Sequence, residues 1–369
     1  MQRISNSTKV KQIMIIGNYG NFNIGDELLL KSLVFQYINK FKGGNVRFFV
    51  PTRHPEFIHV YHEEIKNKLI SFKVLDLKKL LLFLLKSDEI LIGGGGMWSA
   101  YTGKLAKLLP LFMVIAGSLK PLFVKGIGLY NTASKMEKIF VNLAFLFAKS
   151  IEVRDEESFH NVWKIVKKSR PVKLVDDLSL NIPILIKNKV NIYKSGLYRL
   201  KETEKLRNAK KIGKKIIGIS IKPLKSDFIN KKIVQEFVFF IKEINKKYPK
   251  HFYFTFFPFA YTSPIEDDIT IINLVLSKLK ESNNLIIIPH TNPIFWHLLI
   301  EEYIDYFIGM RFHAIALAYL SAKPLLGIPY ENKVLQFLKR YKYQNIVMPE
   351  DLNRKTLVDF LERAANIKL

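Results

Sequence analysis

Short apolar runs alternate with amphipathic segments along most of the chain, and this alternation restricts the fold more than any other feature. The runs are strand-like, and the segments between them have the apolar spacing of helices. Strands joined by helices run parallel and are covered on both faces, so the pattern predicts doubly wound α/β sheets. In the first half, strands are predicted at residues 12–17, 46–50, 88–96 and 121–130, with two more beginning at residues 150 and 173.

A charged stretch at residues 188–214 interrupts this pattern. It has little apolar periodicity and is predicted to be a linker or solvent loop. The alternation then restarts, with strands predicted at residues 215–223, 251–259, 284–290, 306–312 and 324–330. We therefore expect two doubly wound Rossmann-like domains facing a cleft. The predicted parts are an N-terminal domain at 1–187, the linker at 188–214, and a C-terminal domain at 215–369 with a closing helix at 351–366.

The chain is strongly basic, with 58 Lys and Arg against 32 Asp and Glu and a formal charge of +26. Such a charge favours anionic partners, including an acidic membrane surface. The lysines are scattered and no nucleic-acid-binding module is recognisable, so a nucleic-acid partner is not expected. The N-terminus does not resemble a signal peptide. The lipid-like residues 108–119 are too few to span a bilayer and, with 141–148, are predicted to be buried helix. We expect a cytoplasmic protein, in peripheral contact with the inner face of the membrane.

The turn after the first strand, GNYGNFNIGDELLL, is rich in glycine and asparagine. Such residues permit tight backbone and offer amide groups, so a loop that reads sugar hydroxyls is one interpretation. A well-made strand-to-helix turn with a capped helix is the other. The nucleotide motifs with fixed glycine spacing are not matched. The candidate residues of this turn are Asn18, Gly20, Asn23, Gly25 and Asp26.

Four consecutive glycines follow the strand in ILIGGGGMW. Glycine in such a run costs backbone entropy, so the backbone is expected to approach something closely. A ligand and a neighbouring segment of the chain are both candidates. The residues in question are Gly94, Gly95 and Gly96.

Arg311 and His313 stand where a predicted strand ends and a helix begins. A guanidinium beside the N–H groups of a helix start suits a phosphate or carboxylate. His313 adds a group that can give or take a proton near neutral pH. Lys222 ends the strand in ISIK and is expected at the same edge.

Other polar residues at strand ends are weaker candidates. Arg154 and Asp155 in EVRDEES are interpreted either as supporting site residues or as an ion-paired helix start. Asp177 and His290 also follow strands, and Lys333 lies in PYENK. The acidic residues have no matching His or Cys cluster, so no metal site is expected.

Together these stretches resemble the polysaccharide pyruvyl transferase family. The resemblance rests on the turn and glycine run above and, above all, on GMRFHAIALAYLSAKPLLGIPYENK, with VRDEESF, LVDDLSL, GISIKP and FFPFAYTSPIEDD in between. It implies a fold like the two-domain GT-B glycosyltransferases and an enzyme that needs no cofactor. It also implies that the enolpyruvyl group of phosphoenolpyruvate moves onto sugar hydroxyls as a ketal.

The resemblance assigns roles to particular residues. It implies that Arg311 and His313 are catalytic, and that they bind phosphoenolpyruvate with Phe312 and Lys222. The family often has arginine at the position of Lys222. The first-domain residues would lie on the side of the acceptor, a sugar of a cell-surface polysaccharide or its lipid-linked precursor.

Two other functions are compatible with the same residues. A glycosyltransferase of this fold that uses a nucleotide sugar would share the glycine loops and the basic pocket, and Glu331 would suit its ribose-binding acid. A non-enzymatic binder of polyanions would need only the charge.

Overall fold

The structure is a computed structural model that describes residues 10–41, 45–98, 108–129, 135–167, 169–261, 267–279 and 284–366. Contacts within the chain define two compact units. The first unit is Met1–Asn21 with Asp26–Leu185, and the second is Phe22–Gly25 with Ile186–Leu369. The short segment Phe22–Gly25 is therefore counted with the second unit, although it lies near the start of the chain.

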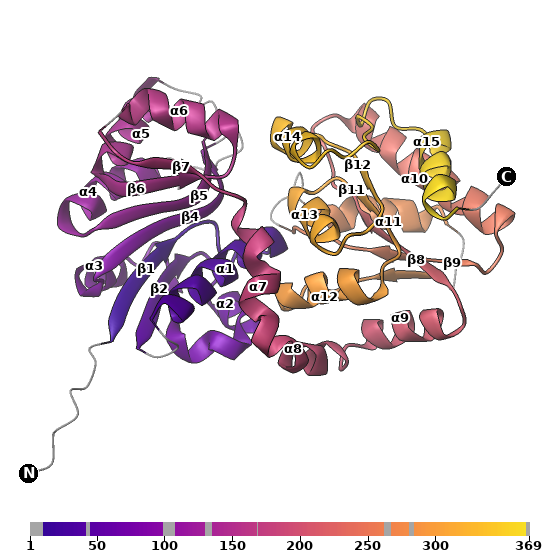
Figure 1. The fold of residues 1–369 in the computed structure, drawn as a ribbon, viewed down its shortest axis with the longest axis horizontal. Coiled ribbons are helices and arrows are strands. Elements are labelled where there is room, and N and C mark those ends of the chain that lie inside the picture. The colour runs from indigo at the N-terminus through magenta and orange to yellow at the C-terminus, as the bar shows by residue number, and fades with distance from the viewer. Residues whose placement is uncertain are drawn as a thin grey trace, which may run out of the picture. The chain divides into compact units, whose positions relative to one another are not determined.

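Among the described residues, the first unit has a seven-stranded sheet in the order β3-β2-β1-β4-β5-β6-β7 (Figure 1). Every neighbouring pair is parallel. The strands are β1 (Lys11–Ile16), β2 (Val46–Thr52), β3 (Leu69–Lys73), β4 (Glu89–Trp98), β5 (Leu122–Leu129), β6 (Ala148–Val153) and β7 (Val172–Leu174).

The chain winds outward from β1 in two directions, so its helices cover both faces of this sheet. The helices are α1 (Ile24–Lys40), α2 (Pro55–Tyr61), α3 (Leu77–Lys86), α4 (Leu109–Leu119), α5 (Lys135–Phe147) and α6 (Glu156–Val166), with 3₁₀ turns η1 (Glu63–Lys68) and η3 (Leu178–Asn181). Leu84 of α3, Met113 of α4, Phe145 of α5 and Val162 of α6 belong to one apolar core with the strands, so these four helices share one face.

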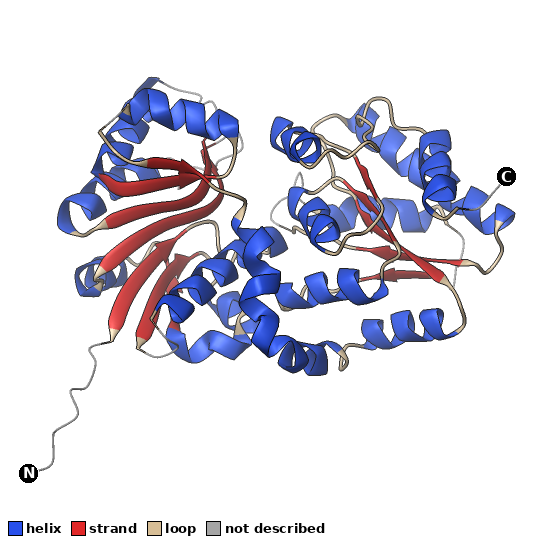
Figure 2. Ribbon diagram, viewed as in Figure 1, coloured by secondary structure: helices blue, strands red, loops and turns tan. Residues whose placement is uncertain are grey.

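The second unit has a five-stranded parallel sheet among its described residues, in the order β10-β9-β8-β11-β12. Figure 2 shows each sheet lying between helices. The strands are β8 (Lys215–Ser220), β9 (Phe252–Phe256), β10 (Leu285–Ile287), β11 (Tyr306–Gly309) and β12 (Leu325–Gly327). The helices around it are α8 (Val190–Leu197), α9 (Lys201–Lys211), α10 (Asp227–Lys247), α11 (Asp268–Ser277), α12 (Pro293–Tyr303), α13 (Phe312–Leu320), α14 (Asn332–Arg340) and α15 (Arg354–Ala364), and α7 (Ile182–Ile186) and η4 (Lys187–Lys189) precede them.

The closing helix predicted at the C-terminus is α15. It packs on α10, and its residues Leu357 and Leu361 join the core of the second unit. The two parallel sheets with helices confirm the predicted α/β class and the repeated strand–helix winding.

The prediction of a charged loop at residues 188–214 is wrong, because most of this stretch forms α8 and α9. Tyr193 and Leu197 are buried on one helix, and Leu206 and Ala209 on the next. These apolar residues are three or four apart, as in a helix, but they are few and surrounded by lysines. The elements β3, α2 and α3 were also not predicted from the sequence.

The sequence pattern predicted that the strand ends at the four glycines, and this prediction is wrong. β4 continues to Trp98 and keeps pairing with β5. Gly94 and Gly95 have φ values of 77° and 89°, a region that non-glycine residues rarely adopt. The register shifts between Gly96 and Trp98. Glycine therefore lets the strand deform without losing its neighbour.

Residues 108–119 are helical, as predicted, but the helix is not wholly buried. α4 buries Met113 and Ala116 and leaves Leu111, Ile115 and Leu119 exposed. A helix on a sheet buries one side only, and here the outer side is apolar as well. No helix in the described ranges combines the length and apolar character needed to cross a bilayer.

Candidate functional site

Lys222 and Arg311 leave the same edge of the second sheet. β8 and β11 are adjacent and parallel, and each residue follows its strand by two positions. The N–H of Met310 donates to the carbonyl of Ser220 at 2.8 Å, which joins the carboxyl ends of the two strands. Arg311 has extended backbone and immediately precedes α13, whose second residue is His313. The predicted basic residues thus share the edge at which parallel sheets bind ligands.

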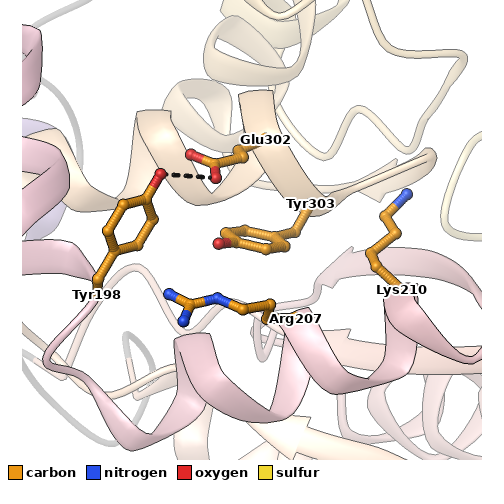
Figure 3. Close-up of a pocket in the computed structure, with 5 residues that line it drawn as sticks. All are labelled: Tyr198, Arg207, Lys210, Glu302 and Tyr303. Carbon is orange, nitrogen blue, oxygen red and sulfur yellow. Dashed lines mark hydrogen bonds between the residues drawn. The ribbon is translucent and has the colours of Figure 1, made fainter.

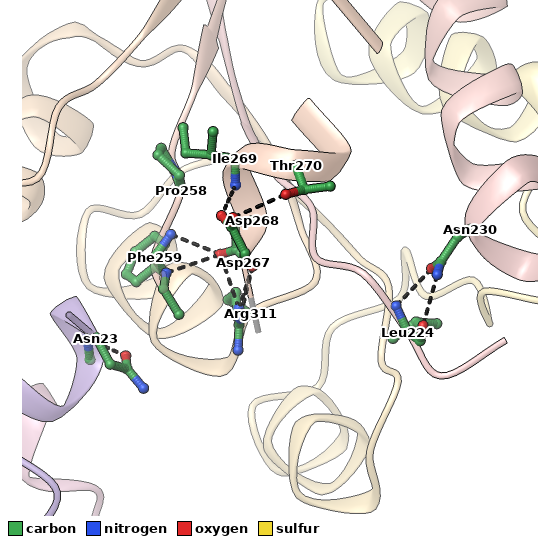
Figure 4. A network of polar contacts seen from close by, with 12 residues as sticks. Asn23, Leu224, Asn230, Pro258, Phe259, Asp267, Asp268, Ile269, Thr270 and Arg311 are labelled. Carbon is green, nitrogen blue, oxygen red and sulfur yellow. Dashed lines mark hydrogen bonds and ion pairs between the residues drawn. The ribbon is translucent and has the colours of Figure 1, made fainter. Parts of the chain in front are cut away.

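Asp268, at the start of α11, fixes the guanidinium of Arg311. Its Oδ1 accepts from Nη2 at 2.6 Å, and both of its oxygens lie 3.1 Å from Nε. Its Oδ2 also accepts from the backbone N–H groups of Phe259 and Ala260 at 2.9 and 3.2 Å. Figure 4 shows the carboxylate between these partners. A forked pairing of this kind sets the plane of the guanidinium as well as its position.

The Arg311–Asp268 pair is removed from water. Asp268 is fully buried and Arg311 nearly so. Burial raises the pKa of Asp268, and the charge and hydrogen bonds of Arg311 oppose that rise. Asp268 lies in FFPFAYTSPIEDD but was not a predicted site residue, because its partner Arg311 lies 43 residues further on and the stretch itself carries no sign of the pairing.

Lys222 is also buried, and its Nζ lies 4.2 Å above the ring of Tyr330. An ammonium over an aromatic face is stabilised by the ring's quadrupole. The loop that follows Lys222 is held by Asn230 of α10, whose side chain exchanges two 2.7 Å hydrogen bonds with the backbone of Leu224 (Figure 4). These contacts hold the buried lysine at the same edge of the sheet as Arg311.

The segment Phe22–Gly25 lies against the backbone that binds Asp268. The N–H of Ile24 donates to Phe259 at 2.9 Å, the N–H of Tyr261 donates to Phe22 at 3.0 Å, and Asn23 forms an isolated antiparallel bridge with Ala260. The segment behaves as a short added strand. It brings two of the residues predicted on the acceptor side into this region: Asn23 lies beside Ala260, and Gly25 lies beside His313.

Gly25 contacts His313 directly. A Cβ built on Gly25 would lie 1.9 Å from Nδ1 of His313 and 2.7 Å from its Cε1. No side chain fits at this position unless the imidazole moves. The glycine of the "IGDE" turn therefore makes room for the histidine of "RFHA", a relation that neither stretch reveals alone.

The remaining candidates of the second unit have structural contacts. Phe312 packs edge-on against Phe337, with ring centroids 5.2 Å apart. Lys333 pairs with Glu331 at 2.6 Å. Burial alone would raise the pKa of Glu331, yet the nearby Lys333 and Lys222 hold it below its usual range.

His290 donates from Nε2 to the carbonyl of Pro258 at 3.0 Å, and its ring lies 4.0 Å from that of Tyr261. Burial lowers the pKa of His290 to about 3. The imidazole is therefore neutral near pH 7 and suits a positioning role better than proton donation.

In the first unit, the candidate residues of the glycine-rich turn form hydrogen bonds and close contacts within the chain. Asn18 donates to Asp26 at 2.7 Å, and a Cβ on Gly95 would lie 3.2 Å from a carboxylate oxygen of Asp26. The N–H of Gly20 donates to Glu27 at 2.6 Å. These contacts match the interpretation of a well-made turn, and a role in binding the acceptor stays a prediction.

The contacts of the glycine run support the interpretation that one segment of the chain packs closely against another. A Cβ on Gly94 would lie 2.7 Å from Cβ of Leu29, and one on Gly93 would lie 2.6 Å from Leu33, so α1 rests on the backbone of β4. The Tyr19 hydroxyl donates to the carbonyl of Gly93. A ligand role for Gly96, which is exposed, stays a prediction.

Arg154 and Asp177 form a buried pair at 3.0 Å. Asp155 accepts from the N–H of Ser158 at 2.8 Å and caps α6. The interpretation of an ion-paired helix start describes these contacts, and a supporting catalytic role stays a prediction. Among the described residues, no group of three or more His, Asp and Glu side chains is arranged to hold a metal ion.

An open pocket of about 640 Å³ lies elsewhere in the second unit (Figure 3). Tyr303 ends α12, just before β11, and Lys210 pairs at 2.6 Å with Asp305, which also accepts from the N–H of Ile216 in β8. The pocket is therefore at the amino ends of β8 and β11, opposite to Lys222 and Arg311. Its lining consists of Tyr198, Arg207, Lys210, Glu302 and Tyr303.

Solved structures with a similar fold include UDP-GlcNAc 2-epimerases. A putative UDP-N-acetylglucosamine 2-epimerase from Listeria monocytogenes aligns with a TM-score of 0.61 at 11% identity, over 97% of this chain and 88% of that one. The UDP-GlcNAc 2-epimerase of Methanocaldococcus jannaschii aligns with a TM-score of 0.61 at 13% identity, over 97% and 94%. Anabaena HepE, solved with UDP and glucose, aligns with a TM-score of 0.59 at 12% identity, over 96% and 90%. At such identities the similarity shows the GT-B-like fold alone.

Sequence comparison identifies the family. No curated protein sequence matched the chain. The family model for polysaccharide pyruvyl transferase matches residues 23–332, a range that includes Gly25, Lys222, Asp268, Arg311 and His313. The chain belongs to the polysaccharide pyruvyl transferase family.

Proposed function

We propose that this protein transfers the enolpyruvyl group of phosphoenolpyruvate to sugar hydroxyls as a ketal and releases phosphate. The observation that carries the proposal is the arrangement of Lys222, Arg311 and His313 at the carboxyl ends of two adjacent strands, with Arg311 oriented by buried Asp268. Membership of the family supports the reaction class. The donor is a small anion with a carboxylate and a phosphate, the groups that basic side chains near a helix start bind best.

The chemistry requires three events that these residues suit. A proton is added to the methylene carbon of phosphoenolpyruvate, which becomes the methyl group of the product. The neighbouring carbon, now electron-poor, accepts one sugar hydroxyl, and its bond to the phosphate oxygen breaks. A second hydroxyl then adds to the same carbon and closes the cyclic ketal; of the two hydroxyl protons released, one balances the proton added to the methylene carbon and the other ends on the phosphate.

We assign these events to named side chains. His313 delivers the proton to the methylene carbon or positions the donor for that step. Arg311 and Lys222 hold the carboxylate and phosphate and stabilise the charge on the leaving group. Because Asp268 already holds the guanidinium of Arg311 in place, little reorganisation is needed when this charge develops. The acceptor is proposed to be a sugar of a cell-surface polysaccharide or of its lipid-linked precursor, modified in the cytoplasm.

The direct test is calorimetric titration of the protein with phosphoenolpyruvate, repeated on Arg311→Ala. We expect binding that is lost in the variant, because the guanidinium supplies charge-assisted hydrogen bonds. His313→Ala is expected to bind phosphoenolpyruvate normally and to release phosphate ~10²- to 10⁴-fold more slowly in the presence of acceptor. Unchanged turnover in this variant would remove His313 from the mechanism.

UDP- and GDP-sugars are the matched comparison ligands. Binding of a nucleotide sugar with no heat from phosphoenolpyruvate would overturn the proposal and support a glycosyltransferase of the same fold. A protein that binds neither ligand and retains polyanions only at low salt would be a non-enzymatic binder.

A further inference from the structure

Three helices of the first unit carry apolar side chains on their outer as well as their inner sides. On α3 and α4 the exposed apolar residues of each stripe are four residues apart, and on α5 they are four and three apart, so each helix presents one continuous stripe. Leu81 is 55% exposed, Ile115 48% and Ile139 57%. We call these side chains the α3–α5 face: Leu77, Leu81 and Leu85 of α3, Leu111, Ile115 and Leu119 of α4, and Ile139, Leu143 and Leu146 of α5.

The three stripes lie on one side of the sheet. The inner sides of α3, α4 and α5 pack into a single core with the strands, so their outer sides point away from the same face. α4 and α5 are in extensive contact, and Nζ of Lys120, after α4, donates to the carbonyl of Leu85 in α3 at 2.8 Å. Figure 1 shows the three helices along the side of the sheet opposite to α1 and α2. Exposed apolar patches of this kind mark interaction surfaces.

The charged residues of α3 are all basic, whereas α5 includes Glu137 as well as Lys135 and Lys138. α3 has Lys78, Lys79 and Lys86 and no acidic residue between Leu77 and Lys86. Asp76 caps its first turn and lies 3.5 Å from Lys79. α4 carries no charged side chain at all. An apolar stripe beside lysines is the pattern of helices that lie in the headgroup region of acidic lipid.

We propose that the α3–α5 face binds the surface of an acidic lipid bilayer, with the three helices lying on it and their leucines and isoleucines entering the headgroup–acyl boundary. Such helices enter a bilayer by about 5–10 Å, which is within the reach of side chains on a helix surface. The basic composition alone suggested contact with acidic lipid; the structure assigns this contact to one face. The proposal does not depend on the reaction catalysed.

A second copy of the chain fits this face less well. In a two-fold dimer the same patch meets itself, and where the axis passes near α3 the lysines of one α3 approach those of the other. Like charges in contact disfavour such pairing, whereas anionic headgroups neutralise them. An acidic bilayer is therefore the occupant that matches both the apolar and the charged residues.

Flotation with lipid vesicles tests the proposal on the full chain. The wild-type protein is expected to float with phosphatidylcholine vesicles that contain phosphatidylglycerol, and less with phosphatidylcholine alone. Raising salt from about 0.1 M to about 1 M should weaken binding only in part, because salt screens the electrostatic attraction but does not remove the apolar contribution. The variant Leu81→Ser/Leu111→Ser/Ile115→Ser is expected to partition at least about tenfold less.

The control is a variant with the same number of exposed apolar side chains removed elsewhere, Ile192→Ser/Ile212→Ser/Phe228→Ser, whose side chains are 65%, 71% and 79% exposed. It should float like the wild type, and circular dichroism should show both variants folded. A second variant, Lys78→Gln/Lys79→Gln/Lys86→Gln, should lose the preference for phosphatidylglycerol while keeping every leucine.

Three results would overturn the proposal. The wild type could fail to float with acidic vesicles. The control could lose binding as much as the α3–α5 variant does, which would indicate unspecific adsorption. Light scattering could show that the wild type is a dimer that the α3–α5 substitutions split, which would assign the face to a second copy.

Discussion

Gly25 lies so close to His313 that a Cβ on the glycine would be 1.9 Å from Nδ1 of the imidazole. The two residues are far apart in the chain, yet both belong to the second unit, because Phe22–Gly25 pairs with the backbone at 259–261. The position of the proposed catalytic imidazole therefore depends on the absence of one side chain.

This contact predicts coupling between the two sites. We expect Gly25→Ala to lower the free energy of unfolding by roughly 1–3 kcal/mol, because an inserted methyl group forces the ring to move. In a His313→Ala background the same substitution should cost almost nothing, since the space is then empty. Urea denaturation of the four proteins in this double-mutant cycle measures the coupling. An equal loss of unfolding free energy with and without His313 would show that the added methyl group does not collide with the imidazole.

The Arg311–Asp268 pair predicts a large cost for removing one charge. Asp268→Asn leaves the guanidinium buried without its counter-charge, so we expect a loss of about 3–5 kcal/mol in unfolding free energy. The control is Asp267→Asn at the neighbouring residue. Asp267 caps α11 by accepting from Ile269 at 3.0 Å, and asparagine caps a helix equally well. The loss of unfolding free energy in Asp267→Asn should stay below about 0.5 kcal/mol. Similar losses in the two variants would contradict a special role of Asp268.

Lys222 should contribute to donor affinity more than to stability. Lys222→Met keeps a side chain of similar length and removes the charge, so we expect the dissociation constant of phosphoenolpyruvate to rise roughly 10- to 100-fold. Lys231→Met, at an exposed position of α10, is the control and should bind normally. Calorimetry compares the three proteins. Equal affinity in Lys222→Met and wild type would place the donor elsewhere.

The glycines of β4 allow a test with a matched backbone control. Gly94 and Gly213 have φ values of 77° and 76°, so alanine is strained by about the same amount at both, about 1–2 kcal/mol. A Cβ on Gly94 would also meet Leu29 at 2.7 Å, whereas a Cβ on Gly213 would meet nothing within 4 Å. Gly94→Ala should therefore destabilise the protein by roughly 1–3 kcal/mol more than Gly213→Ala, as measured by urea denaturation. Equal losses would mean that α1 adapts without cost.

The buried pair of Glu27 and His62, 2.8 Å apart, predicts how stability depends on pH. Burial raises the pKa of Glu27 to about 8 and lowers the pKa of His62 well below its usual value. In the unfolded chain the values are about 4.3 and about 6.5. Between about pH 4.5 and 6.5 the folded pair holds one proton on Glu27 and the unfolded pair holds one on His62, so stability is unaffected.

Between about pH 6.5 and 8 only the folded pair keeps its proton. The pair's contribution to stability should then fall by about 1.4 kcal/mol for each pH unit. Glu27→Gln keeps an acceptor for the N–H of Gly20 and has no proton to lose, so its stability should change less over this interval. Urea denaturation of both proteins at the two pH values measures the difference. An equal pH dependence in the variant would show that Glu27 is already ionised.

The architecture, and the sheet edge at which Lys222 and Arg311 emerge, follow from the order of the residues alone. Strands buried on both faces leave continuous apolar runs, so β1, β8 and β11 were predictable, and parallel order followed from the helices between them. The residues at the ends of such strands must share one edge of the sheet, which is why the basic candidates were found together.

The partners of these residues depend on the three-dimensional fold. A periodic pattern reports whether a position is buried, but it does not identify what buries it. Asp268 holds Arg311, Gly25 makes room for His313, and α1 rests on Gly94 through contacts between distant segments that carry no local signal. For the same reason, the prediction that α4 is a buried helix holds for one side only. Hydrophobicity alone does not distinguish a side chain in a core from one on a surface.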